Sequence, residues 1–274
     1  MNHTFKFIGI CAIIFMLLGV SPSYADNTVD NIWKDDTVNI NLGMFLTNRD
    51  TKVRVDSRTL GRGTELNAEE DLGLSKDKSV TRTDIYVRLA QNHRFDFSYY
   101  DLSRDTTRVI NKTIQYGDVT FPINTTIKSN FNLTIVKAAY SYLFIRNAKM
   151  ELGLSAGIFI QDYDIQIQQI GGANAQAKAE AFAPLPVIGL KGTWRFSDKW
   201  WLRTSAEIFS LSYDDYSGHL TDVMVAVEYN MFENIGFGVG YNNTSFKLRA
   251  DADKFIGEVN IDYGGVIAYT KVHF

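Results

Sequence analysis

The fold is decided by the last seven residues of the chain, AYTKVHF at positions 268–274. Val272 and Phe274 fall on one side of an extended backbone, and Lys271 and His273 fall on the other, because successive side chains of a strand point to opposite faces. An apolar face backed by a polar face is typical of a strand between two different environments. Nine further segments alternate in the same way, which predicts about ten strands.

The first 25 residues differ from the rest of the chain. Lys6 supplies a basic start, and the apolar stretch from Phe7 to Val20 is too short to cross a bilayer comfortably as a helix. Ser23-Tyr24-Ala25 then places small residues at the −3 and −1 positions of a cleavage site. We therefore expect a cleaved signal peptide at 1–25, with an uncleaved anchor as the alternative, and a single domain at 26–274.

The composition of residues 26–274 excludes several classes of protein. The chain has one cysteine, Cys11, so the expected domain contains no disulfide and no thiolate metal site. Without Lys6, 27 of the 28 basic residues face 31 acidic ones, a net charge of −4 that does not suit nucleic acid. No run of 18 apolar residues follows residue 25.

A membrane protein without such a helix closes its backbone hydrogen bonds in a barrel. We therefore expect an all-β fold, a closed antiparallel transmembrane β-barrel of about ten strands. The pattern places the strands at 37–47, 81–90, 94–106, 129–143, 149–163, 184–196, 200–212, 220–231, 235–248 and 255–274. Gly264-Gly265 is compatible with a bulge or a turn, but one long strand keeps the count even.

The connections between these segments alternate in length. Three long ones, 48–80, 107–128 and 164–183, are typical of external loops, and the short ones are typical of periplasmic turns. The three prolines after residue 25 are expected in loops or at strand starts, where a missing N–H costs least: Pro122, Pro184 and Pro186.

Aromatic residues gather near both ends of the expected strands, which predicts two girdles at the membrane interfaces. The girdle at the short-turn end comprises Phe95, Phe144, Phe196, Trp200, Trp201, Tyr229, Phe232 and Phe274. The girdle at the other end comprises Tyr99, Tyr163, Phe209, Tyr213 and Phe246.

The face opposite the apolar one carries charges of both signs, and we expect it to line the lumen. The candidate lumen charge network is Asp84, Arg88, Arg94, Glu151, Lys191, Arg203, Glu207, Glu228 and Lys271, with Asp96 and Arg195 on the same face. Side chains nearly fill a barrel of this size, so the favoured interpretation is an ion-paired core that closes the lumen. The alternative is a narrow water-filled channel, since four glycines leave free volume on this face: Gly153, Gly236, Gly238 and Gly240.

The long loops contain two further features. The acidic cluster Glu69-Glu70-Asp71 has ligands for a divalent cation, but its spacing matches no EF-hand loop. Pairing with nearby arginines (Arg54, Arg58, Arg62) is the favoured interpretation. In the second long loop, Tyr116-Gly117-Asp118 predicts a turn between two β-like arms.

An enzyme would need a catalytic cluster at the outer rim, where His219 follows Asp214 and Asp215 in the sequence. Ten-stranded outer-membrane proteases use acidic residues and a histidine at that level, but their paired-aspartate motif is absent here, and Asp-x-His does not occur. No serine is placed to act with His219, as a lipid deacylase would need. We expect no enzyme and no cofactor, and a rim-located hydrolase remains an alternative.

Four short motifs carry a resemblance to known proteins: Gly63-Thr64-Glu65-Leu66 before Glu69 to Leu74, Asn92-His93-Arg94-Phe95 with Ser98-Tyr99-Tyr100, Ile114-Gln115-Tyr116-Gly117-Asp118, and Tyr263-Gly264. With these motifs in this order, the chain resembles a widespread set of uncharacterised Gram-negative outer-membrane β-barrel proteins. More distantly it is similar to barrels of the outer-membrane protein A type. The resemblance implies the barrel fold and the bacterial outer membrane as its location.

The expected function is that of a non-enzymatic barrel with a structural or surface-interaction role. A narrow channel for small polar solutes is the alternative. Expected partners are outer-membrane lipid and lipopolysaccharide, and the barrel-assembly machinery, which would engage the C-terminal strand ending at Phe274. The ligand of the loops is left open, and no nucleic acid is expected.

Overall fold

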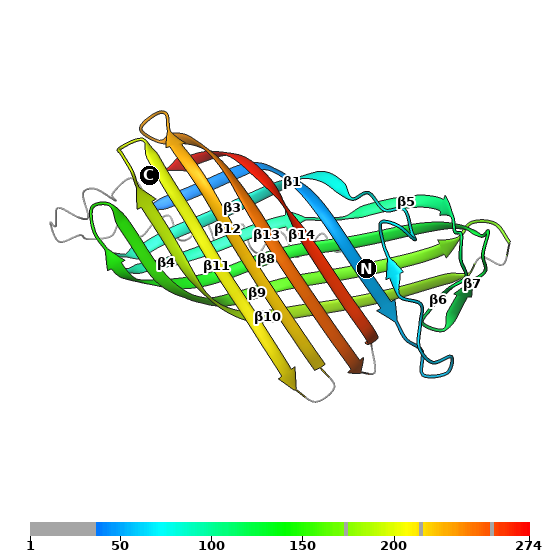
Figure 1. Ribbon diagram of the computed structural model, residues 1–274. Helices are drawn as coiled ribbons and strands as arrows, with labels where there is room; N and C mark the ends of the chain where they lie inside the picture. Colours follow the sequence, from blue (N-terminus) through cyan, green and yellow to red (C-terminus); the bar gives the residue numbers. More distant parts are fainter. Residues whose placement is uncertain (1–36, 173–174, 214–215, 253–254) are drawn as a thin grey trace.

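The computed structural model describes residues 37–172, 175–213, 216–252 and 255–274 (Figure 1). The expected signal peptide at 1–25 lies outside them. The strands are β1 (Val38–Val55), β2 (Leu66–Asn67), β3 (Asp77–Ala90), β4 (His93–Asp101), β5 (Arg104–Val109), β6 (Ile114–Tyr116), β7 (Val119–Phe121), β8 (Thr126–Arg146), β9 (Met150–Gln169), β10 (Gln176–Arg195), β11 (Trp200–Tyr213), β12 (Tyr216–Asn230), β13 (Ile235–Ala252) and β14 (Phe255–His273). In these residues, no helix is long and apolar enough to cross a membrane.

The long strands pair with their neighbours in chain order, all antiparallel, and β14 returns to pair with β1. That last pairing runs from Asn39 opposite His273 to Val55 opposite Gly257. β4 and β5 follow each other along the same edge of β8 and together count as one of the ten barrel strands. The closed ten-strand antiparallel barrel predicted from the sequence is confirmed.

The last strand continues through Gly264 and Gly265 without a register shift, so the prediction of one long strand is confirmed. The strands approach each other closely here. A Cβ on Gly265 would lie 1.9 Å from the carbonyl oxygen of Leu46. Only glycine fits at this point of the closing seam between β14 and β1.

The outer face of the barrel is apolar over the central part of each strand. On β1, Leu42, Met44 and Leu46 are exposed, and on β9 Leu154 and Ile158 are exposed, as the alternation predicted. An aromatic girdle surrounds the end that holds Val38 and the C-terminus, where the connections are short. Its exposed members include Phe95, Phe144, Phe196, Trp200, Phe232 and Phe274. By the usual orientation of such barrels, this is the periplasmic end.

Trp201 was predicted in this girdle, but it is buried and faces the lumen. The second girdle was predicted wrongly for a related reason. Tyr163 and Phe246 are buried inside the barrel, and the partly buried Phe209 lies on the inward face of β11. All four occupy the inward positions of their strands, so their rings fill the interior. Tyr99 faces outward, and the side chain of Tyr213 is outside the described residues.

The strands run further at the loop end than the sequence pattern predicted. β9 continues to Gln169 and β10 begins at Gln176, so the predicted loop 164–183 is mostly a hairpin. The reason is that the pattern reverses outside the lipid. There the outward residues, such as Asp162, are polar, and the inward ones, such as Ile165 and Ile167, are apolar.

Above the lipid belt the interior is closed by a cap, which we define as residues 56–76 and 110–125. The predicted turn at Gly117 connects β6 and β7, and Gly117 has a φ of 59°. The two parts of the cap are joined to each other by a hydrogen bond from the N–H of Thr64 to the carbonyl of Gln115 (2.9 Å). Their apolar side chains pack with the upper wall in one core, including Leu66, Leu72, Leu74, Ile110, Ile114, Phe121, Phe159 and Ile261.

Candidate functional site

The predicted lumen residues lie below this apolar core, at the level of the lipid belt. Near the periplasmic end, both oxygens of Glu151 are held by Arg88, at 2.9 and 3.0 Å. Arg146 approaches the same carboxylate at 3.1 Å. All three side chains are buried or nearly so. A buried carboxylate needs such partners, because an unpaired charge in a low-dielectric interior is very costly.

A second carboxylate near this end, Glu228, is shared by two cations. Arg203 contacts its Oε1 through Nε at 2.8 Å, and Lys271 contacts Oε2 at 2.8 Å. The hydroxyl of Tyr269 donates a third bond to Oε1 at 2.9 Å. Glu228 and Lys271 are completely buried, so side chains of three strands, β11, β12 and β14, meet at one carboxylate inside the barrel.

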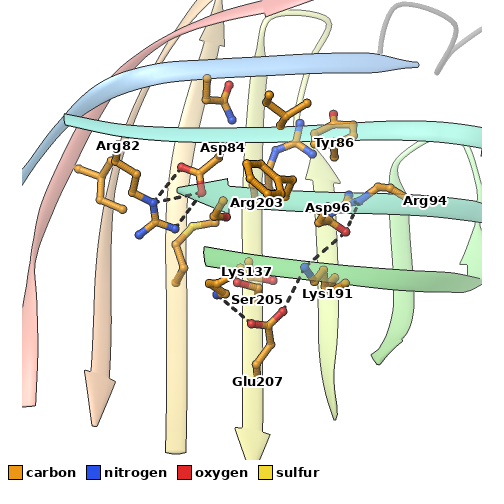
Figure 2. A pocket seen from close by; sticks show the side chains of 18 of the residues that line it. Arg82, Asp84, Tyr86, Arg94, Asp96, Lys137, Lys191, Arg203, Ser205 and Glu207 are labelled. Atoms are coloured by element: carbon orange, nitrogen blue, oxygen red, sulfur yellow. Dashed lines mark hydrogen bonds and ion pairs between the residues drawn. The ribbon is translucent and has the colours of Figure 1, made fainter. Parts of the chain in front are cut away.

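A chain of alternating charges crosses the lumen above these clusters (Figure 2). It begins where Arg94 binds Asp96 at 2.7 Å, and Lys191 reaches Asp96 at 3.4 Å. Lys191 also lies 3.2 Å from Glu207. Arg94 and Asp96 occupy alternate positions of β4, whereas Lys191 and Glu207 lie on β10 and β11. The ion pairs therefore help to fix these strands relative to one another.

The same chain continues from Glu207 to Lys137 at 2.8 Å and from Lys137 to Asp222 at 2.5 Å. Asn242 donates to Asp222 at 2.9 Å and accepts from Arg82 at 2.6 Å. Arg82 in turn holds the predicted residue Asp84 at 2.9 Å.

All nine predicted lumen residues therefore lie in connected ion pairs, whereas Arg195 pairs at the periplasmic turn with Asp198. Four members were missed by the sequence reasoning: Arg82, Lys137, Arg146 and Asp222. The alternation already indicated two of them. Arg82 is two residues from Asp84 and Asp222 is six residues from Glu228, so each lies on the same face of its strand as a predicted lumen residue. Lys137 lies on β8, where the alternation is weakest.

The space inside the network is small. A cavity of about 60 Å³ lies among Arg82, Lys137, Arg203 and Glu207, enough for a few water molecules. The glycines do not leave the free volume that the sequence suggested. A Cβ on Gly238 would lie 2.2 Å from the ring of Tyr269, which occupies the space above this glycine.

Aromatic rings fill the gaps between the ion pairs. The ring of Tyr86 lies between two guanidinium groups, 4.5 Å from Arg94 and 4.7 Å from Arg203. Lys271 lies 4.8 Å from the ring of Trp201. Such cation–π contacts stabilise desolvated cations, and they explain why Trp201 faces the lumen.

Comparison with solved structures supports this architecture. The outer-membrane protease OmpT from Escherichia coli superposes with a TM-score of 0.60, covering 93% of this chain and 100% of that one at 13% identity. This chain has the outer-membrane barrel fold. Neisserial surface protein A (NspA) and the translocator domain of the autotransporter NalP from Neisseria meningitidis give TM-scores of 0.35 and 0.43, at 13% and 9% identity. They cover 87% and 97% of this chain, and 97% and 95% of their own.

Scans against family models and curated proteins give no match. At these identities the structural likeness establishes the fold and nothing about the chemistry.

Of the three residues expected at a catalytic rim, His219 is the one that lies within the described ranges. His219 is exposed on the outer face of β12, the face that carries Val223 and Val225 nearer the membrane. Its imidazole lies 3.3 Å from the hydroxyl of Thr221. Asp214 and Asp215 lie outside the described residues.

Two members of the acidic cluster of the cap pair with cations other than the predicted arginines. Glu69 binds Arg104 at 2.5 Å and accepts from the N–H of Thr51 at 2.9 Å. Asp71 binds Lys112 at 2.8 Å. The partners come from β5 and from the loop that follows it, because the cap folds inward toward those strands. Within the described ranges, no group of three or more acidic, histidine or cysteine residues is placed to hold a metal ion.

Of the predicted arginines, Arg54 instead binds Asp56 at 3.0 Å and reaches Glu258 at 3.8 Å. Arg249 and Lys247 surround Glu258 on the outer face, at 3.0 and 3.2 Å. Burial raises the pKa of Glu258, but hydrogen bonds from Arg249 and Lys247 outweigh it and hold the pKa below its ordinary value.

A larger rim cleft, of about 790 Å³, opens at the loop end. It is lined by 55–59, 116–119, 176–180 and Ile256. The turn at Asp118 forms one side, and Asp118 accepts hydrogen bonds from Ser57 (2.5 Å) and Thr59 (3.1 Å). These two bonds lower the pKa of Asp118 below its ordinary value.

Proposed function

We propose that this chain is a closed, non-enzymatic outer-membrane barrel that acts through contacts made at its extracellular end. The observation that carries the proposal is the filled interior. Paired charges occupy the lumen at membrane level, and the cap packs apolar side chains above them. A path for polar solutes would have to cross a dry apolar layer, where each desolvated polar group costs several kcal/mol. The rim cleft is the hollow that a partner could enter.

Planar-bilayer recording of the purified protein tests the closed lumen. We expect no reproducible conductance steps from the wild type. An ion crossing the filled lumen would lose its hydration shell, and the apolar layer offers no groups to replace it. A narrow channel would give steps whose size changes in Arg203→Gln or Glu207→Gln. Such steps would contradict the proposal and support the alternative.

The hydrolase alternative has its own test. The outward position of His219 favours a non-catalytic role, since carboxylate partners and substrate would have to meet it on the outer wall. We expect the purified protein to leave lipid A, phospholipid and peptide substrates unchanged. A hydrolytic activity in the wild type that His219→Ala abolishes would contradict the proposal.

A further inference from the structure

The barrel wall is open along one seam, between β10 and β11. Their pairing begins at Arg195 opposite Trp201 and stops at Ile188 opposite Ile208. β10 extends twelve residues beyond that point, to Gln176, and remains paired on its other edge with β9. Figure 1 shows the strands diverging, with β10 running toward β6 and β7 and β11 running away from them. Beyond Ile188, β10 stays paired with β9 but separates from β11, and its far end lines the rim cleft together with Ile256 of β14.

Two prolines explain why the seam stays open. Continuing the register would place Pro186 opposite Ser210 and Pro184 opposite Ser212. The N–H of Arg195 points to the β9 side, where it donates to Lys149, and the N–H of Phe196 points to the β11 side. The even-numbered residues of β10 therefore direct their N–H groups toward β11. Pro184 and Pro186 have no backbone N–H, so these donors are missing.

The prolines also argue against a protein strand as the occupant of the seam. A strand added to the free edge of β10 would need the donors that the prolines remove, and prolines on an edge are a common protection against such pairing. The seam therefore calls for an occupant that needs no backbone hydrogen bonds.

The side chains at the lower end of the seam and on the inward face of β11 are apolar, whereas Ser210 and Ser212 face outward beyond Ile208. On the lipid side, Ile188 and Ile208 are 64% and 51% exposed. On the inward face of β11, Leu211 is 51% exposed, and Phe209 is partly buried against Gly218 and the apolar core. In a closed wall the inward residues would be covered. Here the lipid-facing surface continues through the seam onto the apolar interior.

The distance of the seam from the periplasmic aromatic girdle shows which leaflet of the membrane it faces. From the girdle residues Phe196 and Trp200, the wall rises about 20 Å to Ile188 and Ile208, at ~3.3 Å per residue and a tilt of ~40°. The apolar band of such barrels is about 25 Å tall. The seam thus begins in the upper part of the outer leaflet, about 5 Å below the top of the band.

We propose that the β10–β11 seam is a docking site for an acyl chain of a lipid of the outer leaflet. The chain enters just beyond the Ile188–Ile208 pair, where the two strands separate, and lies against Phe209 and Leu211. This surface is continuous with the lipid-facing belt, which is already covered by acyl chains. The proposal depends on the barrel fold alone and not on the closed lumen.

The test uses single cysteines, since the only native cysteine is Cys11. A bimane label is placed on Leu211→Cys in the full chain, reconstituted in nanodiscs of phosphatidylcholine with or without bromine atoms on the acyl chains. We expect bromolipid to quench the label at Leu211→Cys about as strongly as at Ile208→Cys. Leu60→Cys, in the cap and as exposed as Leu211 (52% against 51%), should not be quenched. Equal, weak quenching at 211 and 60 would overturn the proposal.

A second variant tests the seam as the route. Pro184→Val with Pro186→Val restores the two missing donors, which should extend the pairing toward Ser212. In this background quenching at Leu211→Cys should fall to the level of Leu60→Cys, while quenching at Ile208→Cys persists and shows that the barrel is inserted. Unchanged quenching at 211 in an inserted barrel would contradict entry through the seam.

Discussion

At the scale of single residues, the lumen network depends most on its shared carboxylates. Glu228 balances Arg203 and Lys271 and also accepts from Tyr269. We predict that Glu228→Gln destabilises the barrel by about 3–5 kcal/mol, because it leaves two buried cations without their counter-charge. Urea unfolding in detergent micelles measures this loss.

The matched control is Glu180→Gln, since Glu180 has a 67% exposed side chain and an ion pair with Lys178 at the rim. Exposed pairs of this kind contribute little, so its unfolding midpoint should stay at the wild-type value. If both variants unfold at the wild-type midpoint, the network does not stabilise the barrel.

The nine candidate lumen residues were chosen from the alternation of the strands, and the structure places each of them in an ion pair, for a physical reason. A strand forces alternate residues onto one face, so a charge on the face opposite an apolar row must point inward. Parity does not show which charge meets which, since pairs such as Lys137 and Asp222 come from strands far apart in the chain. Nor did it show that the ring of Tyr269 occupies the space above Gly238.

At the scale of elements, the outward face of β9 provides a test of register. Leu154 is 60% exposed in the lipid belt and lies near its middle, opposite Leu190 and Tyr142. We predict that Leu154→Arg costs about 2–4 kcal/mol, the cost of a cation at the bilayer midplane. Reversible unfolding from liposomes measures it.

Ile170 provides the control for this variant, because it is exposed just past the end of β9, above the belt. Ile170→Arg should be close to neutral. Equal costs at the two positions would mean that the belt does not lie where the exposed apolar residues place it.

The contact between the cap's first turn and the β6–β7 hairpin should depend on pH. Asp118 accepts from Ser57 and Thr59, which lowers its pKa below the ordinary value of 3.8. A carboxylate with a depressed pKa in the folded state stabilises the contact above its ordinary pKa, and this contribution is lost as the pH falls through the lowered value. The protection of residues 57–63 from hydrogen exchange, relative to the intrinsic exchange rate at each pH, should therefore fall below about pH 4.

Asp118→Asn is the matched variant, because the amide does not titrate in this range. This variant should lose the acid-dependent step, so that the protection factors of residues 57–63 are the same on both sides of pH 4. A step of undiminished size would assign the pH dependence to another group.

The strand ends were predicted less well than the strands themselves. Alternation of apolar and polar residues locates a strand wherever lipid lies on one side. Beyond the belt, water lies outside and the core lies within, so the same strand has the reverse pattern. That reversal placed Tyr163 and Phe246 in a girdle when they belong to the core, and it shortened β9 and β10 at their loop ends.

At the scale of the whole molecule, the barrel interior has two regions. Ion pairs stabilise the region at membrane level, and apolar packing stabilises the region under the cap. We predict that Phe121→Asp, at a fully buried position of the cap, releases the cap and leaves the membrane-level barrel closed. Trypsin should then cleave after Arg108 or Lys112, while the heat-modifiable migration of the folded barrel in gels is retained.

The surface variant Thr120→Asp is the control, since Thr120 is exposed on the same short strand. It should remain as resistant to trypsin as the wild type. If Phe121→Asp abolishes heat-modifiable migration as well, the cap and the wall form a single cooperative unit.

The distant origin of the lumen pairs has a consequence for biogenesis. Arg88 and Glu151 are 63 residues apart, and Lys137 and Asp222 are 85 apart. A single hairpin that entered the bilayer alone would carry charged side chains without their ion-pair partners. Lipid cannot solvate such charges. Neutralisation is completed only when remote hairpins meet, so membrane insertion and ring closure must occur as one concerted event.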